Sequence, residues 1–184
     1  SLNIVPVVAQ GTIRAGVMGF GPEQASSTQL ATMQTEVIKA MEAGAFGLSS
    51  GLIYPPGCYT STKELIALTK PVGERGGYYF SHIRGQDGRL LAAVAEAIEI
   101  GRNSGASVQI SHLLASWPAN WEKHGQALEL IDQARDQGLD ICADVFPYQT
   151  GHTNLKATLP AWSQQGGKNA LMERLADGQI RKLM

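Results

Sequence analysis

Five short apolar runs recur along the chain at regular intervals. Each run is four or five residues long and is bounded by polar or glycine-rich segments, the pattern of a buried strand. The predicted strands cover residues 6–9, 46–49, 78–81, 108–111 and 141–145. From the second strand onward, a new strand begins every 30 to 33 residues, which is about the length of one strand-helix unit. This regularity predicts a parallel sheet with right-handed helical crossovers.

Helical patterns fill most of the intervals between these strands. Leu30, Met33, Val37 and Met41 form an apolar stripe that predicts a helix ending at Gly44. Similar stripes begin near residues 65, 91 and 128, and a last helix is expected over residues 169–176. The pattern alone leaves two architectures open, because an open doubly wound sheet and a (β/α)₈ barrel are built from the same units.

Two local signals refine the helix that follows the second strand. Ser61 and Glu64 match the Ser-x-x-Glu capping box, which predicts a helix start at Ser61. Pro71 falls within the same apolar pattern, and proline has no N–H to donate inside a helix. We therefore expect Pro71 to end or kink this helix.

Composition narrows the class of protein. The 184 residues carry a formal net charge of −1, with 43% hydrophobic and 17% charged residues, the range of an ordinary soluble globular protein. The near-neutral balance argues against electrostatic binding of nucleic acid, and no apolar run reaches the roughly 18–20 residues of a membrane span. Two cysteines are too few for a disulfide framework. With no signal peptide visible, we expect a cytoplasmic protein with free thiols.

Two histidines occupy equivalent positions at the ends of neighbouring predicted strands. Ser81-His82 ends the third strand and Ser111-His112 ends the fourth. The carboxyl ends of parallel strands are where such folds build their active sites, and adjacent strands lie about 4.8 Å apart. We therefore expect His82 and His112 to converge on one metal ion.

Other candidates carry less specific signals, each with a structural alternative. Arg84 could present its guanidinium to a substrate carboxylate or pair at the surface with Asp87. Tyr54 precedes a stiff Pro-Pro-Gly segment that could hold its hydroxyl over a cleft or use the ring as a loop anchor. Asp144 could be a ligand or an acid/base, or could cap the following turn.

The remaining histidines and cysteines are expected to have ordinary structural places. His124 falls early in a predicted helix and His152 in a loop, so both are expected at the surface. Cys58 is expected as a free loop thiol, although a thiolate is a zinc ligand in principle. Cys142 lies within the fifth strand and is expected in the core.

Several motifs in this order and spacing resemble those of the D-aminoacylase, or N-acyl-D-amino-acid deacylase, family of the amidohydrolase superfamily. The motifs cover residues 42–57, 81–84, 109–113, 120–121 and 143–148. The resemblance implies a (β/α)₈ TIM-type barrel of the metal-dependent hydrolase kind, of which about five βα units are present. Residues 1–184 would then be the central part of a single barrel, with the N-terminal and C-terminal strands absent.

The resemblance also implies roles for individual residues. His82 and His112 match zinc ligands on the fifth and sixth barrel strands, Tyr54 a substrate-contacting tyrosine, and Arg84 the arginine of a His-x-Arg motif. The family's His-x-His pair and cysteine ligand would precede the chain, and its catalytic aspartate would follow Met184. The segment by itself is therefore expected to be inactive and to bind metal weakly. Its open sheet edges are expected either to form homo-oligomers or to leave parts of the chain poorly ordered.

The sequence departs from the family pattern at four places. Ala9-Gln10 stand where Gly-His is usual, and Gly85-Gln86 replace an acidic pair. Leu114 replaces a lysine and Phe146 a tyrosine. The loss of the lysine removes a cation from the substrate side, so we expect weaker binding of a free α-carboxylate.

The resulting expectation is zinc-dependent hydrolysis of a C–N amide bond in a small-molecule substrate, in the manner of an N-acyl-D-amino-acid deacylase. Two alternatives remain at this point. One is a related amidohydrolase acting on a cyclic amide or a dipeptide. The other is a non-catalytic barrel homologue in which the two histidines are relics.

Overall fold

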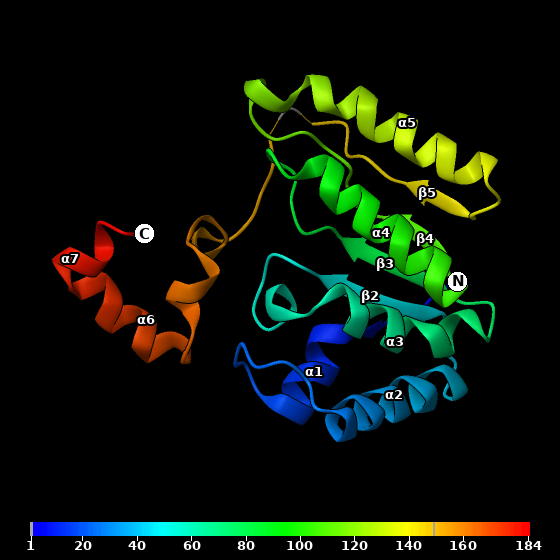
Figure 1. Ribbon diagram of the computed structural model, residues 1–184, viewed down its shortest axis with the longest axis horizontal. Coiled ribbons are helices and arrows are strands. Elements are labelled where there is room, and N and C mark those ends of the chain that lie inside the picture. Colours follow the sequence, from blue (N-terminus) through cyan, green and yellow to red (C-terminus); the bar gives the residue numbers. More distant parts are fainter. Residues whose placement is uncertain (1, 149) are drawn as a thin grey trace.

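The centre of the molecule is a sheet of five parallel strands in the order β1-β2-β3-β4-β5 (Figure 1). The computed structural model describes residues 2–148 and 150–184. The strands are β1 (Val8–Ala9), β2 (Gly47–Gly51), β3 (Tyr78–His82), β4 (Ser107–Ile110) and β5 (Ile141–Ala143). Every strand pairs with its neighbour in sequence, whereas a doubly wound sheet reverses its strand order. The architecture is therefore an arc of a (β/α)₈ barrel, as the resemblance implied.

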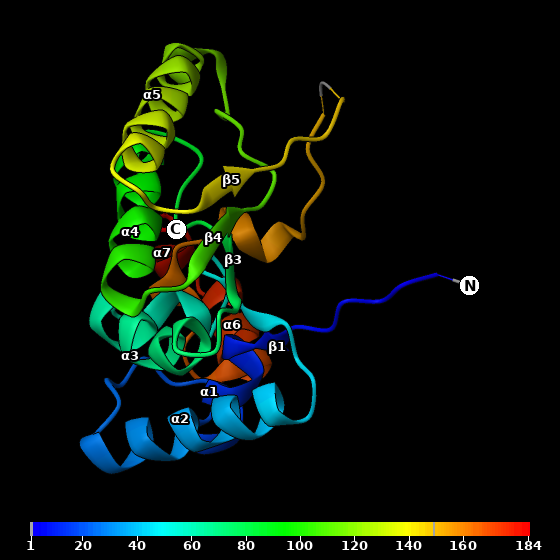
Figure 2. The same ribbon diagram turned by 90° about the vertical axis from the view of Figure 1, so that its right-hand side faces the viewer.

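Helices follow the strands, and most of them cover one face of the sheet. They are α1 (Gln10–Met18), α2 (Ser27–Glu42), α3 (Thr62–Gly73), α4 (Leu90–Ser104), α5 (Glu122–Asp136), α6 (Gly167–Ala176) and α7 (Gly178–Arg181). Figure 2 shows α3, α4 and α5 against one face, while the opposite face looks toward the N-terminal segment and the loop after β5. The last two helices project from the body at the left of Figure 1.

Helix α1 is absent from the sequence prediction, and its burial pattern explains why. Its two buried side chains are Gln10 and Arg14, both polar. A helix that buries polar groups shows no apolar stripe, and the 3.6-residue pattern is the signal by which helices are recognised. Only the partners supplied by other elements, described below for Arg14, make this burial favourable.

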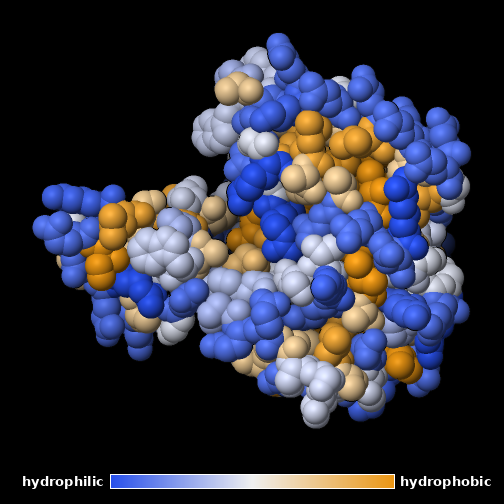
Figure 3. Space-filling model, in the orientation of Figure 1, coloured by the Kyte–Doolittle hydropathy of each residue, from blue (hydrophilic) through white to orange (hydrophobic). Residues whose placement is uncertain are grey.

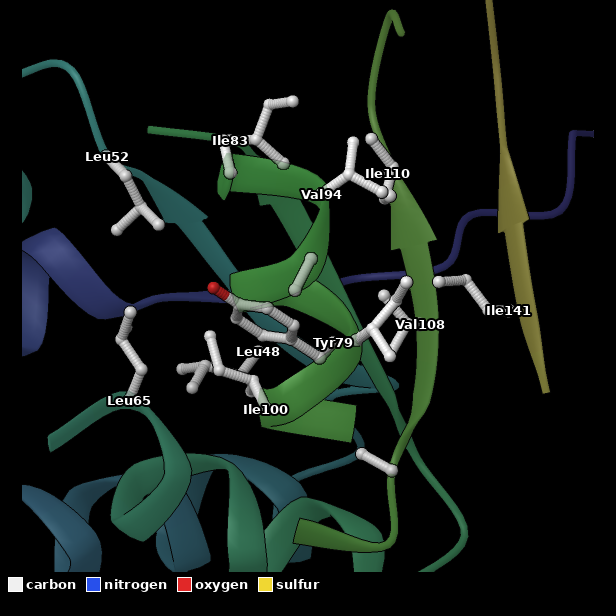
Figure 4. Packing of buried hydrophobic residues seen from close by; sticks show 14 of the residues in the cluster. Leu48, Leu52, Leu65, Tyr79, Ile83, Val94, Ile100, Val108, Ile110 and Ile141 are labelled. Carbon is white, nitrogen blue, oxygen red and sulfur yellow. The ribbon is translucent and has the colours of Figure 1, made fainter. Parts of the chain in front are cut away.

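The hydrophobic core lies between the sheet and its helices. Leu48, Tyr79, Val108 and Ile141 point from four neighbouring strands toward the helical layer, where Ile100 of α4 meets them (Figure 4). Alternate residues of each strand point to the other face of the sheet. That face carries Ser49, Phe80 and Gln109, which are half-buried. Cys142, expected in the core, belongs to it and is exposed, because it alternates with buried Ile141.

Helix α3 begins at the predicted position, but with only half of the expected capping box, and it continues past Pro71. Ser61 accepts the N–H of Glu64 as expected, but the Glu64 side chain turns to Arg14 and leaves the capping box half formed. Pro71 lies inside the helix without ending it there. The carbonyl of Ala67, which a residue with an N–H at position 71 would bond, instead accepts from Gln34 Nε2 of α2 at 2.9 Å. A neighbouring helix thus replaces the bond that proline cannot make.

The surface in the orientation of Figure 1 is mostly hydrophilic, with hydrophobic residues gathered over the region of α4 and α5 (Figure 3). None of the helices in the described part of the chain combines the length and apolar character needed to cross a bilayer.

Candidate metal centre

His82 and His112 reach the same end of the sheet by different backbone routes. His82 is the last residue of β3, and the register pairs Ser81 with Ile110. Ser111 therefore lies opposite His82, and a regular extension of β4 would send the next side chain to the helical face. Instead, His112 has a φ of +40°. This left-handed turn departs from the strand path and places its imidazole beside that of His82.

The two imidazoles meet directly. Nδ1 of His82 lies 2.9 Å from Nε2 of His112, and the ring centroids are 4.5 Å apart at an interplanar angle of 72°. Two nitrogens bound to one tetrahedral zinc at 2.0–2.1 Å would be about 3.3 Å apart. An increase of about 0.4 Å in the distance between these nitrogens would therefore let both contact one ion. The pair thus fits two imidazole ligands of a metal site.

Burial favours the neutral form of His82. Desolvation by burial, reinforced by the electrostatic effect of the neighbouring His112, lowers the pKa of His82 to about 4. A neutral imidazole is the form that binds a metal ion. Nε2 of the same ring is buried and has no hydrogen-bond partner among the described residues. The site therefore presents an uncharged histidine with one nitrogen facing the second histidine.

Two side chains hold His112 in its unusual conformation. Asp144 Oδ1 accepts the backbone N–H of His112 at 2.5 Å, and Oδ2 accepts Gln109 Nε2 at 2.7 Å. Gln86 Nε2 lies 2.9 Å from both Nδ1 and the carbonyl oxygen of His112. The contacts show Asp144 bonding to the backbone of the histidine loop rather than to the facing imidazole nitrogens. Sequence reasoning noted Gln86 only as a departure from a family pattern.

Tyr54 lies beside the histidine pair. Its ring centroid is 5.4 Å from that of His82, and its hydroxyl bonds Thr153 Oγ1 at 2.8 Å. The bond joins the loop after β2 to the segment after β5. The tyrosine therefore anchors the loop after β2, one of its two expected arrangements, and does so beside His82.

Arg84 is held by internal contacts. Nε and Nη2 donate to the two carboxylate oxygens of Glu96 at 2.9 and 3.0 Å, while Nη1 reaches the carbonyl of Cys58 and Nη2 that of Thr60. These bonds use four of the five guanidinium N–H groups. The alternative pairing with Asp87 is wrong, because Asp87 bonds the neighbouring Arg89 instead.

The other candidates lie apart from the pair. His152 is exposed and His124 is half-buried. His124 lines a cavity of about 390 Å³ together with Leu114, Trp121 and Phe146. The Phe146 ring centroid is 6.4 Å from that of His112, so the cavity adjoins the histidine pair.

Cysteine chemistry is not favoured at this end of the sheet. Cys58 is a half-buried free thiol, and burial raises its pKa. Across residues 2–148 and 150–184, no three His, Cys, Asp or Glu side chains come together closely enough to hold a metal ion. The described residues thus supply two imidazoles to the candidate centre.

The amino-acid sequence was compared with those of known proteins. No family model matches the chain. It is 35% identical over 154 residues to N-acyl-D-glutamate deacylase of Alcaligenes xylosoxydans xylosoxydans, covering 84% of this chain and 32% of the relative. It is 33% identical over 156 residues to the D-aminoacylase of the same organism, covering 85% and 32%. The chain thus spans about a third of the length of these curated relatives.

Solved structures agree with the sequence comparison. The crystal structure of N-acyl-D-glutamate deacylase from Bordetella bronchiseptica, complexed with zinc and a phosphonate mimic of the tetrahedral intermediate, superposes with a TM-score of 0.78 at 34% identity. The match covers 80% of this chain and 31% of that one. A crystal structure of D-aminoacylase, described as defining a novel subset of amidohydrolases, gives a TM-score of 0.73 at 33% identity, covering 77% and 30%. Over the part of the barrel that it spans, the chain belongs to the D-aminoacylase family of amidohydrolases.

Proposed function

We propose that residues 1–184 form part of a single amidohydrolase barrel that hydrolyses the C–N amide bond of an N-acyl-D-amino acid with the help of zinc. The observation that carries the proposal is the 2.9 Å approach of His82 Nδ1 to His112 Nε2 at the carboxyl end of the sheet. The zinc-bound relative of similar fold supports the choice of metal. The deacylase relatives support the choice of bond and substrate.

In this proposal His82 and His112 hold the metal, and other residues arrange the substrate. Bound zinc supplies Lewis-acid polarisation of a carbonyl and a water whose pKa is lowered toward ~7. Tyr54, whose hydroxyl now bonds Thr153, exchanges this bond for one to the substrate. Arg84 keeps its ion pair with Glu96 and offers the substrate its remaining Nη1–H.

The cavity beside the pair indicates what kind of substrate group fits there. Leu114, Trp121 and Phe146 give it a largely apolar lining, and Leu114 stands where the family has a lysine. A carboxylate placed there would lose a charge-assisted hydrogen bond, at a cost of about 1.5–3 kcal/mol. We infer a preference for N-acyl-D-amino acids with an apolar group directed into this cavity.

The cellular setting belongs to the same proposal. We infer a cytoplasmic enzyme that acts on a small molecule, consistent with the free thiols of Cys58 and Cys142. The near-neutral charge supports a small-molecule partner over nucleic acid. Homo-oligomer formation through the sheet edges is a further part of the proposal, and sedimentation measurements on the chain would test it.

Zinc titration of the 184-residue chain tests the metal assignment. We expect one weak zinc site that His82→Asn and His112→Asn each abolish, because two imidazoles bind zinc more weakly than the three or four ligands of a complete site. His124→Asn is the matched control, since His124 lies outside the pair, and it should leave binding unchanged. Zinc binding that survives His82→Asn, or that depends on His124, would overturn the assignment.

A further inference from the structure

Gln86 links the two loops that carry the histidine pair. It lies in the loop after β3, four residues beyond His82, and its side chain crosses to the loop after β4. Nε2 of Gln86 is 2.9 Å from the carbonyl oxygen of His112 and 2.9 Å from Nδ1 of the same residue. The backbone carbonyl of Gln86 accepts the N–H of Ser116 at 2.6 Å, which ties its main chain to the same loop.

These contacts determine the direction of the hydrogen bonds. A carbonyl oxygen can only accept, so the carboxamide end facing His112 is the NH₂ group. The same nitrogen therefore donates to Nδ1 of His112, and Nδ1 must be an acceptor. A neutral imidazole has one protonated nitrogen, so the proton of His112 is on Nε2.

The proton placement continues into His82. Nε2–H of His112 points at Nδ1 of His82 across 2.9 Å, which makes this Nδ1 the acceptor. The proton of neutral His82 then lies on its Nε2, the buried atom that has no partner among the described residues. One arrangement of protons thus satisfies the contacts of Gln86 and His112 together. It leaves only the Nε2–H of His82 without a hydrogen-bond partner among the described residues.

Metal binding requires the opposite tautomer of His112. Ligation through Nε2 needs its lone pair, so the proton must move to Nδ1, where it would face the NH₂ group of Gln86. Two donors cannot bond each other, and turning the carboxamide over would give up the bond to the His112 carbonyl. A carboxylate at position 86 has no donor for that carbonyl in either tautomer, so its contact with the ring favours Nδ1–H, whose proton it accepts, in the carboxylate-histidine-metal arrangement that raises ligand basicity.

We propose that Gln86 is a positioning residue that fixes which nitrogen of His112 carries the proton and thereby restrains the affinity of the histidine pair for zinc. The tautomer part rests on the contacts between Gln86 and His112 alone. The affinity part rests on the proposed function. The two parts can therefore fail separately.

The first experiment reads the tautomer directly. Imidazole ¹⁵N spectra of the metal-free 184-residue chain at about pH 8, where histidine is ordinarily neutral, should show His112 as the Nε2–H tautomer. Gln86→Glu should convert it to Nδ1–H. Gln86→Met, which neither donates nor accepts there, should give a mixture. Gln133→Glu, at an exposed position of α5, adds the same charge elsewhere and should match the unchanged chain.

The second experiment measures zinc affinity by competition with a chelating indicator. Gln86→Glu should bind zinc about tenfold more tightly or better, the scale on which partners of metal-bound histidines act, and Gln133→Glu should bind as the unchanged chain does. An Nδ1–H tautomer of His112 in the unchanged chain, or no conversion in Gln86→Glu, would overturn the proposal. If the tautomers convert but zinc binds no variant, the proposed function fails and the tautomer role of Gln86 stands. If zinc binds and the affinity does not change with the tautomer, the affinity part is overturned while the proposed function stands.

Discussion

The buried ion pair between Arg14 and Glu64 allows a quantitative test of how α1 is held. Nη1 of Arg14 lies 2.7 and 2.6 Å from the two carboxylate oxygens of Glu64, and the side chains are 0% and 4% exposed. Removing one partner leaves the other charge buried without compensation, which costs about 3–5 kcal/mol. We expect Glu64→Gln to lower the free energy of unfolding by about that amount, a large part of the ~5–15 kcal/mol that stabilises a typical domain.

Two comparisons separate this effect from ordinary surface charge. Lys39 and Glu36 form an ion pair that is 63% and 46% exposed, and such pairs contribute about 0–1 kcal/mol. Lys39→Met should therefore change the free energy of unfolding by less than about 1 kcal/mol. The double replacement Arg14→Met with Glu64→Leu should recover most of the loss, because apolar pairs of similar volume often match a buried ion pair in stability.

Urea unfolding followed by far-ultraviolet circular dichroism would give these free energies, provided that the slope with denaturant is unchanged among the variants. If Glu64→Gln lowers the free energy of unfolding no more than Lys39→Met does, water must reach the Arg14–Glu64 pair. The burial of α1 against α3 would then be wrong. A double replacement as unstable as Glu64→Gln would instead show that the charges contribute more than their volume and that the desolvation argument fails.

Three further predictions concern the site and the sheet. Asp144→Ala should weaken zinc binding by about tenfold to a hundredfold, because the N–H of left-handed His112 loses its acceptor, and Asp136→Ala on α5 should not. In the metal-free chain, the pKa of His82 is about 4 when folded, against an ordinary value of about 6.5, so the unfolded state takes up the proton first. Unfolding midpoints should therefore fall as the pH drops from 6.5 to 4, with a shallower fall in His82→Gln. A Cβ at Gly47 would lie 2.0 Å from the carbonyl oxygen of Tyr78, so Gly47→Ala should cost at least about 1–3 kcal/mol, whereas Gly16→Ala, in open space, should be neutral or stabilising in the same urea measurement.

Sequence by itself determined the repeating strand-helix order, the strand positions to within two or three residues and the end of the sheet where the histidines gather. These features depend on local periodicity, because a buried strand or the apolar stripe of a helix is visible within about ten neighbouring residues. The Ser-His dipeptide at the ends of two neighbouring strands is likewise a local signal, and it predicted that the two histidines lie close together. Parallel strands place their carboxyl ends together, so an equivalent position in sequence becomes proximity in space.

Only the tertiary structure decided which polar groups meet. Glu64 left its expected capping contact for Arg14, fifty residues away, and Arg84 turned to Glu96 rather than to Asp87. The left-handed turn at His112 brings its ring to His82 and is held by groups 26 and 32 residues distant, Gln86 and Asp144. Such contacts are chosen by competition among all donors and acceptors that the fold brings within about 3 Å. Local periodicity in the sequence does not predict which of these contacts form, because the outcome depends on where distant segments lie.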